Sequence, residues 1–252
     1  METLRALHLL HPTAIAFENL DPFLGRPVLL DMQSVQKKLI HGGRGGYCFE
    51  QNGLFWRVLL ALGFRVTGLS ARVLRGRPED LSPRSHMLLK VELPEGIYIA
   101  DIGFGSQTLT APLRLDDPHP QETPHGLFRV VKKGDEYDEQ ALLGGEWETQ
   151  YRFGMQDYYP QDYEALNWYR ATHPQSPFVT TLIAARPRPG KRLGLRDNHY
   201  AVRHQDGRTE KCTFSKPSEI MAVLEKDFGL TLPEPRAALE TALERVITRS
   251  AT

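Results

Sequence analysis

The chain has 252 residues, of which 40% are hydrophobic and 25% are charged, as expected for a globular protein with one large domain or two to three small ones. Lysine plus arginine equals aspartate plus glutamate at 31 each, so no long-range field attracts nucleic acid or an anionic membrane. No apolar run reaches the roughly 18 residues of a membrane-spanning helix, and the start METLRALHLLHP does not have the pattern of a secretory signal peptide. We therefore expect a cytoplasmic protein.

The first part of the chain, to about residue 63, is predicted to be helical. LRALHLLH is rich in apolar residues, and the segment from Leu29 to Ile40 repeats them with helical spacing. The third predicted helix follows Cys48, and Gly63 supplies its stop signal. Its apolar stripe comprises Leu54, Phe55, Val58, Leu59 and Leu62.

From Phe64 the pattern changes to short segments rich in β-branched residues and separated by Gly and Pro, which predicts strands. These are RVTGLSARVL, SHMLLKVEL, IYIADIGF, 127–132 and 147–153. A helix is expected over 162–169, strands over 192–195, 199–203 and 210–214, and two final helices over 218–228, with Ser218 as N-cap, and 236–248. The order predicts an α+β protein of three parts.

Cys48 is the first candidate for chemistry. Two glycines precede it, which allow a sharp turn and a close approach to a ligand. If a helix begins here, free N–H groups and the positive end of the helix dipole favour a thiolate over a thiol. The alternative is a small buried hydrophobic residue, which is the commonest state of an isolated cysteine.

A nucleophilic cysteine needs a base, and His86 is the best-placed of nine histidines. It opens a predicted strand in which Met87, Leu89, Val91 and Leu93 share one face, while His86 faces the other way with Leu88. The alternative is a structural histidine with its hydrogen bonds satisfied within the fold.

Asp101 ends the next apolar run, where burying an acid is costly unless it is paired. A two-residue loop at Pro94-Glu95 would pair Leu93 with Gly96, which makes Asp101 and His86 diagonal neighbours on one face. A three-residue loop would break this parity. With the two-residue loop, Asp101 can orient His86 as the third member of a Cys-His-Asp triad.

Other signals are weaker. HGGRGG resembles a phosphate-binding loop but lacks the lysine spacing and the preceding strand. The two cysteines and scattered histidines do not have the close spacings of zinc sites, so no metal is expected. Cys212 is expected to be a structural thiol, and Glu18 and Arg44 are either a pair that braces the loop before Cys48 or two ordinary surface charges.

Five motifs resemble the bacterial type of the arylamine N-acetyltransferase family over nearly the whole chain. They are AFENLDPFLGRP, RGGYCFEQNGLF, SHMLLKVEL, ADIGFG and NWYRATHPQSPF. The resemblance implies acetyl-CoA as donor and arylamines, arylhydroxylamines or arylhydrazines as acceptors, with a part in xenobiotic metabolism. It implies no metal and no nucleic-acid or membrane partner, and the sequence does not indicate the oligomeric state.

The resemblance also implies roles for individual residues. Cys48 is the nucleophile, His86 its base and Asp101 the orienting acid. Substrate and coenzyme contacts fall on Phe17, Ser85, Phe104, Gly105 and Phe178, and support of the active-site loop falls on Glu18 and Arg44. Backbone N–H groups beside Cys48 are the expected oxyanion donors.

The resemblance implies a helical domain, a central β-barrel and a C-terminal α/β lid. The expected boundaries are 1–66 for the helical domain, 67–160 for the barrel, 161–185 for an interdomain helix and linker, and 186–252 for the lid. Family members usually carry about one further helix before ETLRALH, so either the start is late or a helix of the first domain is missing, which would affect packing but leaves the triad intact.

Three alternatives remain open at this point. The same triad type serves cysteine hydrolases and transglutaminase-like enzymes. The same fold also serves amide formation in secondary metabolism. A binding protein that holds coenzyme A or aromatic amines without turnover would be distinguished from a catalyst by the absence of covalent acetylation.

Overall fold

The computed structural model describes residues 1–76 and 83–250, and the N-terminal part is helical as predicted. Helix α4 starts at Cys48. Leu54, Phe55 and Leu59 of the predicted stripe are buried, whereas Leu62 lies just past the end of the helix and is exposed. The helices of this part are α1 (Glu2–Ala14), α2 (Leu20–Phe23), α3 (Met32–Gln36), the π-helical turn η1 (Lys37–His41) and α4 (Cys48–Ala61).

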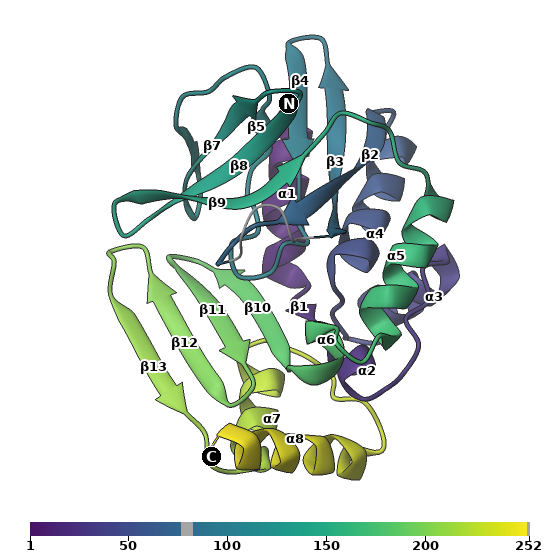
Figure 1. Cartoon of the computed structure of the whole chain (residues 1–252), viewed down its shortest axis with the longest axis vertical. Helices are drawn as coiled ribbons and strands as arrows, with labels where there is room; N and C mark the ends of the chain where they lie inside the picture. Colours follow the sequence, from purple (N-terminus) through teal and green to yellow (C-terminus); the bar gives the residue numbers. More distant parts are fainter. Residues whose placement is uncertain (77–82, 251–252) are drawn as a thin grey trace.

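An eight-stranded antiparallel sheet forms the middle of the chain and curves into a nearly closed barrel (Figure 1). The strand order is β5-β4-β3-β2-β9-β8-β7-β6. The Gln121 side chain bonds the backbone N–H and C=O of Arg114 at 2.7 and 2.9 Å, which joins the two edge strands. The strands are β2 (Arg65–Val73), β3 (Arg84–Leu93), β4 (Gly96–Ala100), β5 (Leu113–Arg114), β6 (Gln121–Thr123), β7 (Gly126–Lys133), β8 (Glu136–Leu143) and β9 (Glu146–Phe153).

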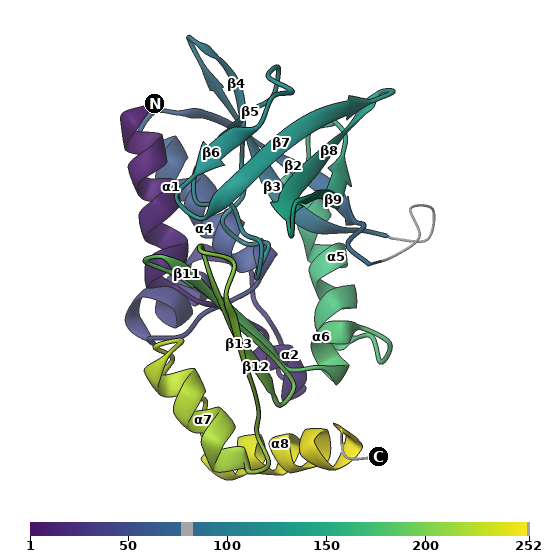
Figure 2. The same ribbon diagram turned by 90° about the vertical axis from the view of Figure 1, so that its left-hand side faces the viewer.

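A second sheet, of order β1-β10-β11-β12-β13, carries the C-terminal part. Its first strand, β1 (Phe17–Glu18), comes from the N-terminal part and pairs with β10 (Ile183–Arg188), so the N-terminal and C-terminal parts share one sheet. The other strands are β11 (Lys191–Arg196), β12 (His199–His204) and β13 (Thr209–Thr213). Figure 2 shows α7 (Pro217–Lys226) and α8 (Arg236–Ser250) beyond this sheet, on the side away from the barrel.

Helices α5 (Pro160–Thr172) and α6 (Pro177–Thr180) connect the barrel to the second sheet.

The predicted N-cap of the helix after β13 is wrong, because α7 begins at Pro217 and its N-cap is Lys216 rather than Ser218. Proline suits the first helical position, since the N–H it lacks would have no partner there.

The two faces of β3 enter different cores, as its alternation predicts. Met87, Leu89 and Val91 pack with α4, whereas Leu88 lies in the barrel interior.

The helical N-terminal part, the barrel and the second sheet with its helices confirm the α+β class and the three-part architecture. The division at residues 66, 160 and 185 stays a prediction. In the described part of the chain, the helices are too short or too polar to cross a membrane.

Candidate active site

Cys48 occupies the first position of α4, as predicted. Its side chain is 3% exposed, and its Sγ lies 4.0 Å from the carbonyl oxygen of Ser85 on β3. The thiol is free. A thiol at this position lies beside the unpaired N–H groups and the positive dipole end of the helix, the setting of reactive cysteines.

The double glycine before Cys48 serves the chain's own packing. A Cβ on Gly45 would lie 2.1 Å from the carbonyl oxygen of Ala16, and one on Gly46 would lie 2.6 Å from the Glu50 carboxylate. Neither glycine has a positive φ, so the sharp turn expected from the sequence is not what requires them. Glycine is needed because protein atoms approach the backbone too closely for a side chain.

Gly45→Ala is expected to lower the free energy of unfolding by about 1–3 kcal/mol, because the methyl group overlaps a fixed backbone oxygen. Gly53→Ala is the matched control, since a Cβ at this α4 position meets no atom within 4 Å; it should raise stability by about 0.5–1 kcal/mol. Urea unfolding followed by circular dichroism measures both. Equal midpoints for Gly45→Ala and the wild type would contradict the packing argument.

The hairpin of β3 and β4 has the predicted register. Leu93 pairs with Gly96 and Leu89 with Ala100, which places Asp101 directly after the strand on the side of His86. His86 Nε2 and Asp101 Oδ2 lie 2.7 Å apart, and both side chains are buried. The structure thus brings the predicted base and acid into hydrogen-bond contact.

Asp101 is held by four further contacts. Its Oδ1 accepts hydrogen bonds from Asn52 Nδ2 at 2.9 Å and from the backbone N–H of Gly103 at 3.0 Å. Its own N–H donates to His8 Nε2 at 3.1 Å, and its carbonyl oxygen accepts from Thr108 Oγ1 at 3.2 Å. Burial opposes ionisation of the carboxyl, but His86 and these donors keep the pKa of Asp101 below its usual value.

Two aromatic rings enclose the His86 imidazole. The rings of Phe104 and Tyr151 each lie 5.0 Å from it, centroid to centroid. Burial favours the neutral ring, yet the charge and hydrogen bond of Asp101 and the contact with Cys48 raise the pKa of His86 to about 10. Because Nε2 is hydrogen-bonded to Asp101, Nδ1 is the ring nitrogen that is free to interact with the thiol.

The raised pKa of His86 predicts a pH-dependent contribution to stability. The folded protein binds the proton more tightly than the unfolded chain, whose histidine titrates at about 6.5, so the contribution is complete below that pH. It declines as the pH rises and is lost above about 10. Urea midpoints of the wild type and His86→Gln, measured from pH 6 to 10.5, should therefore converge with rising pH. A constant difference would contradict a charged His86.

A cavity of about 840 Å³ opens over Cys48 and His86, between the barrel and the second sheet. Ser85, Phe104 and Gly105 line it from the barrel side, and Phe17 and Phe178 meet edge to face at 6.0 Å. All five residues expected to contact substrate or coenzyme therefore border one space. The lining also includes five basic residues, of which the last three are exposed: Arg75, Arg170, Arg196, Arg203 and Lys211.

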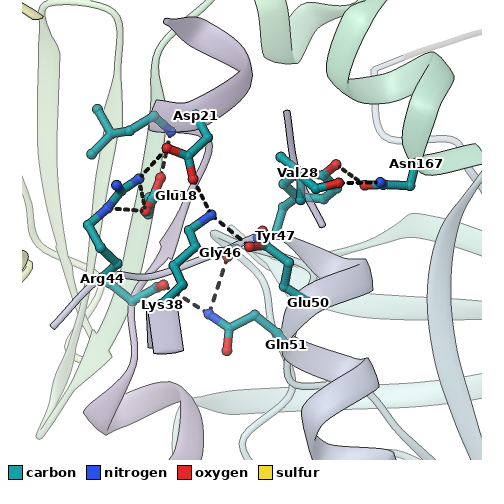
Figure 3. Close-up of polar contacts among 12 residues, drawn as sticks. Glu18, Asp21, Val28, Lys38, Arg44, Gly46, Tyr47, Glu50, Gln51 and Asn167 are labelled. Carbon is teal, nitrogen blue, oxygen red and sulfur yellow. Dashed lines mark hydrogen bonds and ion pairs between the residues drawn. The ribbon is translucent and has the colours of Figure 1, made fainter. Parts of the chain in front are cut away.

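Glu18 and Arg44 form an ion pair beside the loop that precedes Cys48, with an Oε1–Nη2 distance of 2.8 Å (Figure 3). Glu18 is completely buried, and its second oxygen accepts the backbone N–H of Leu20. These are not ordinary surface charges. The pair connects the loop that carries Arg44 to β1, which contributes Phe17 to the cavity.

Asn52 was missed in the sequence, although it lies four residues after Cys48 and hence on the same helix face. Its Nδ2 donates to the carbonyl oxygen of Met87 at 2.7 Å as well as to Asp101, and its Oδ1 accepts the N–H of Ile102. One side chain thus joins the helix of Cys48 to the strand of His86 and to the loop of Asp101.

Within residues 1–76 and 83–250, no group of three or more His, Cys, Asp or Glu side chains is placed to hold a metal ion. A buried Cys, His and Asp beside a large cavity is the arrangement found in enzymes that use a cysteine nucleophile.

Comparisons with known proteins narrow this class. The N-acetyltransferase family model matches residues 1–237. The chain is 43% identical to the arylamine N-acetyltransferase of Escherichia coli, over 94% of this chain and 84% of the relative. It also matches the structure of the Mycobacterium marinum enzyme in complex with CoA, with a TM-score of 0.94 and 37% identity over 97% of this chain and 93% of that one. The chain belongs to the arylamine N-acetyltransferase family, so the resemblance seen in the sequence is confirmed.

Proposed function

We propose that this protein transfers an acetyl group from acetyl-CoA to aromatic amines and hydrazines, and to arylhydroxylamines, through an acetyl-cysteine intermediate. The observation that carries the proposal is the hydrogen-bond contact of His86 with Asp101, because His86 and Cys48 both line the cavity. A relative from Salmonella typhimurium, 41% identical over 91% of this chain and 82% of its own length, is an arylamine N-acetyltransferase and N-hydroxyarylamine O-acetyltransferase.

In the first half-reaction, the Cys48 thiolate attacks the carbonyl carbon of the thioester. The bond from that carbon to the coenzyme sulfur breaks, and the departing sulfur takes the proton of the His86 imidazolium. Backbone N–H groups at the start of α4 stabilise the oxyanion. Asp101 accepts the hydrogen bond of His86 Nε2–H, so that in the neutral imidazole the unprotonated nitrogen is the one that faces the thiol.

In the second half-reaction, the aromatic amine attacks the acetyl-cysteine carbonyl. Neutral His86 takes the proton that the nitrogen loses, the bond to sulfur breaks, and the thiolate–imidazolium pair returns. The covalent intermediate divides one transfer into two attacks on a thioester by a positioned nucleophile. The electrons and protons balance without any oxidant or metal.

The cavity suits both substrates. The rings of Phe17 and Phe104 supply an apolar wall for an aromatic acceptor. The basic residues of the lining, among them Arg75, Arg203 and Lys211, suit the phosphates of a nucleotide-containing donor. We assign acceptor contacts to the two phenylalanines and coenzyme contacts to Ser85, Gly105 and Phe178.

We further propose that the protein acts in the cytoplasm. Both cysteines, Cys48 and Cys212, are free thiols in the structure, and a reducing compartment preserves a nucleophilic thiol. The partners we propose are small molecules only.

Steady-state kinetics with acetyl-CoA and a substituted aniline test the proposal. The covalent intermediate predicts parallel double-reciprocal lines when one substrate is varied at several fixed levels of the other. Intersecting lines would require both substrates to be bound before transfer and would contradict the mechanism. Release of coenzyme A without an acetylated aniline would identify a hydrolase instead.

A further inference from the structure

Lys38, on the π-helical turn η1, lies between two carboxylates beside the nucleophile. Its Nζ is 2.6 Å from Glu50 Oε1 and 2.7 Å from Asp21 Oδ2, and its side chain is 17% exposed. Asp21 also contacts Arg44 at 3.2 Å. Figure 3 shows the resulting row of alternating charge, which runs from Glu18 through Arg44, Asp21 and Lys38 to Glu50.

The end of this row contacts the start of the nucleophile helix. Glu50 lies two residues after Cys48, and its Oε2 accepts the backbone N–H of Tyr47 at 3.1 Å. Tyr47 is the N-cap of α4 and immediately precedes Cys48. Gly46 leaves the space that the Glu50 carboxylate fills. A single carboxylate, that of Glu50, therefore connects Lys38 to the backbone beside Cys48.

We propose that Lys38 is a positioning residue for Cys48, which it serves by keeping Glu50 ionised as the cap of the nucleophile helix. This inference rests on the proposed function for its activity readout. Sequence reasoning assigned no role to Lys38, Glu50 or Asp21, and the pair of Glu18 and Arg44 alone does not reach α4.

The charges around Glu50 explain why it depends on Lys38. Burial opposes its ionisation and is stronger than the opposing effect of Lys38, so the pKa of Glu50 is raised, and Glu18 adds like charge. Asp21 and Arg44 lie further along the row, where Asp21 contacts Lys38 and Arg44 contacts Glu18 and Asp21. Removing Lys38 takes away the cation in direct contact, so Glu50 binds a proton more readily.

Tyr47 is a second titratable residue beside Glu50, to which its backbone N–H donates. Burial raises the pKa of its phenol, and Glu50 adds to this effect. The phenol is therefore neutral over the pH range of the test, and its hydroxyl bonds Asn167. Titration of Tyr47 therefore does not contribute to the pH dependence of the rates measured below.

Lys38→Met is the decisive variant, and the readouts are the single-turnover rate of Cys48 acetylation by acetyl-CoA and the rate of its alkylation by iodoacetamide, from pH 6 to 9. We expect both rates to fall about 10- to 100-fold at pH 7, as for a misplaced reacting group, while the concentration dependence on acetyl-CoA changes little. Raising the pH should restore part of the rate as Glu50 ionises. Lys38→Arg should retain most of the rate.

The double variant Lys38→Met/Glu50→Gln separates positioning from a merely structural role. The glutamine side chain cannot titrate, so the double variant should lack the rise of rate with pH that is expected for Lys38→Met. Wild-type rates in Lys38→Met, or the same slow rate and pH profile in both variants, would overturn the inference.

If Lys38→Met does not fold, the double variant is compared with Glu50→Gln alone. Similar rates in these two support the inference, since position 50 then carries no charge for Lys38 to keep ionised; a rate about tenfold lower in the double variant overturns it. Failure of the proposed function is distinguishable, because the wild type would then not be acetylated while alkylation would still report on the position of Cys48.

Discussion

Replacing Cys48 with alanine is expected to abolish acetyl transfer, with a loss of at least about a thousandfold in kcat/KM, since no other group can carry the acetyl group. The side chain is small and lies at the start of α4, so the fold should survive the change. Turnover of acetyl-CoA with a substituted aniline measures the effect, and circular dichroism checks the fold.

Cys212→Ala is the matched control, because Cys212 is the second free thiol but is exposed. It should keep activity within a few-fold of the wild type, because it takes no part in the proposed chemistry. Activity that survives in Cys48→Ala and disappears in Cys212→Ala would contradict the assignment of the nucleophile.

Asp101→Asn should have the second-largest effect, a loss of about 10³- to 10⁴-fold in kcat, as for other triads that lose their orienting carboxylate. The amide would donate to His86 Nε2, which forces the proton to the ring nitrogen that faces Cys48. That tautomer cannot accept a proton from the thiol. The rate of Cys48 alkylation by iodoacetamide near pH 7 should fall with activity.

The control for this substitution is Asp117→Asn. Asp117 also contacts a histidine, with an Oδ1–Nδ1 distance of 2.8 Å to His119, but this pair is exposed and outside the site. Exposed pairs contribute little, so the variant should match the wild type in rate and stability. Full activity of Asp101→Asn would show that His86 needs no orienting acid.

Local patterns predicted much of the fold. The apolar stripe after Cys48 predicted α4, and alternation predicted the two faces of β3. The register of the β3–β4 hairpin followed from a two-residue turn, and it carried the pairing of His86 with Asp101. Such features depend on residues close in sequence, which is why the sequence alone indicates them.

Five strands were missed. Three of them, β1, β5 and β6, have only two or three residues each, which is too short for a periodic pattern in the sequence. Strand β8, with the sequence EYDEQALL, has acids where a strand usually has β-branched residues, and β10 contains Pro187. Strand propensity depends on the packing of a side chain against neighbouring strands, which the sequence does not show. In β8, Asp138 pairs with Arg152 of β9 at 2.6 Å, so the acid is accommodated by a distant partner.

The site was predicted in part. The triad assignment relied on short spacings and on the family resemblance, whereas Asn52 and the row from Glu18 to Glu50 depend on contacts between segments far apart in the chain. A double glycine indicates a close approach but not which atom approaches. Only the structure shows that Ala16 and Glu50 are the neighbours.

Intact-protein mass spectrometry tests the central claim most directly. The protein is exposed briefly to acetyl-CoA without acceptor, measured, and measured again after an aromatic amine is added, with peptide mapping to locate the modification. We expect one acetyl group on Cys48 that disappears when the amine is added. A folded protein that acquires no adduct, or an adduct on Cys48 that the amine does not remove, would contradict transfer through an acetyl-cysteine.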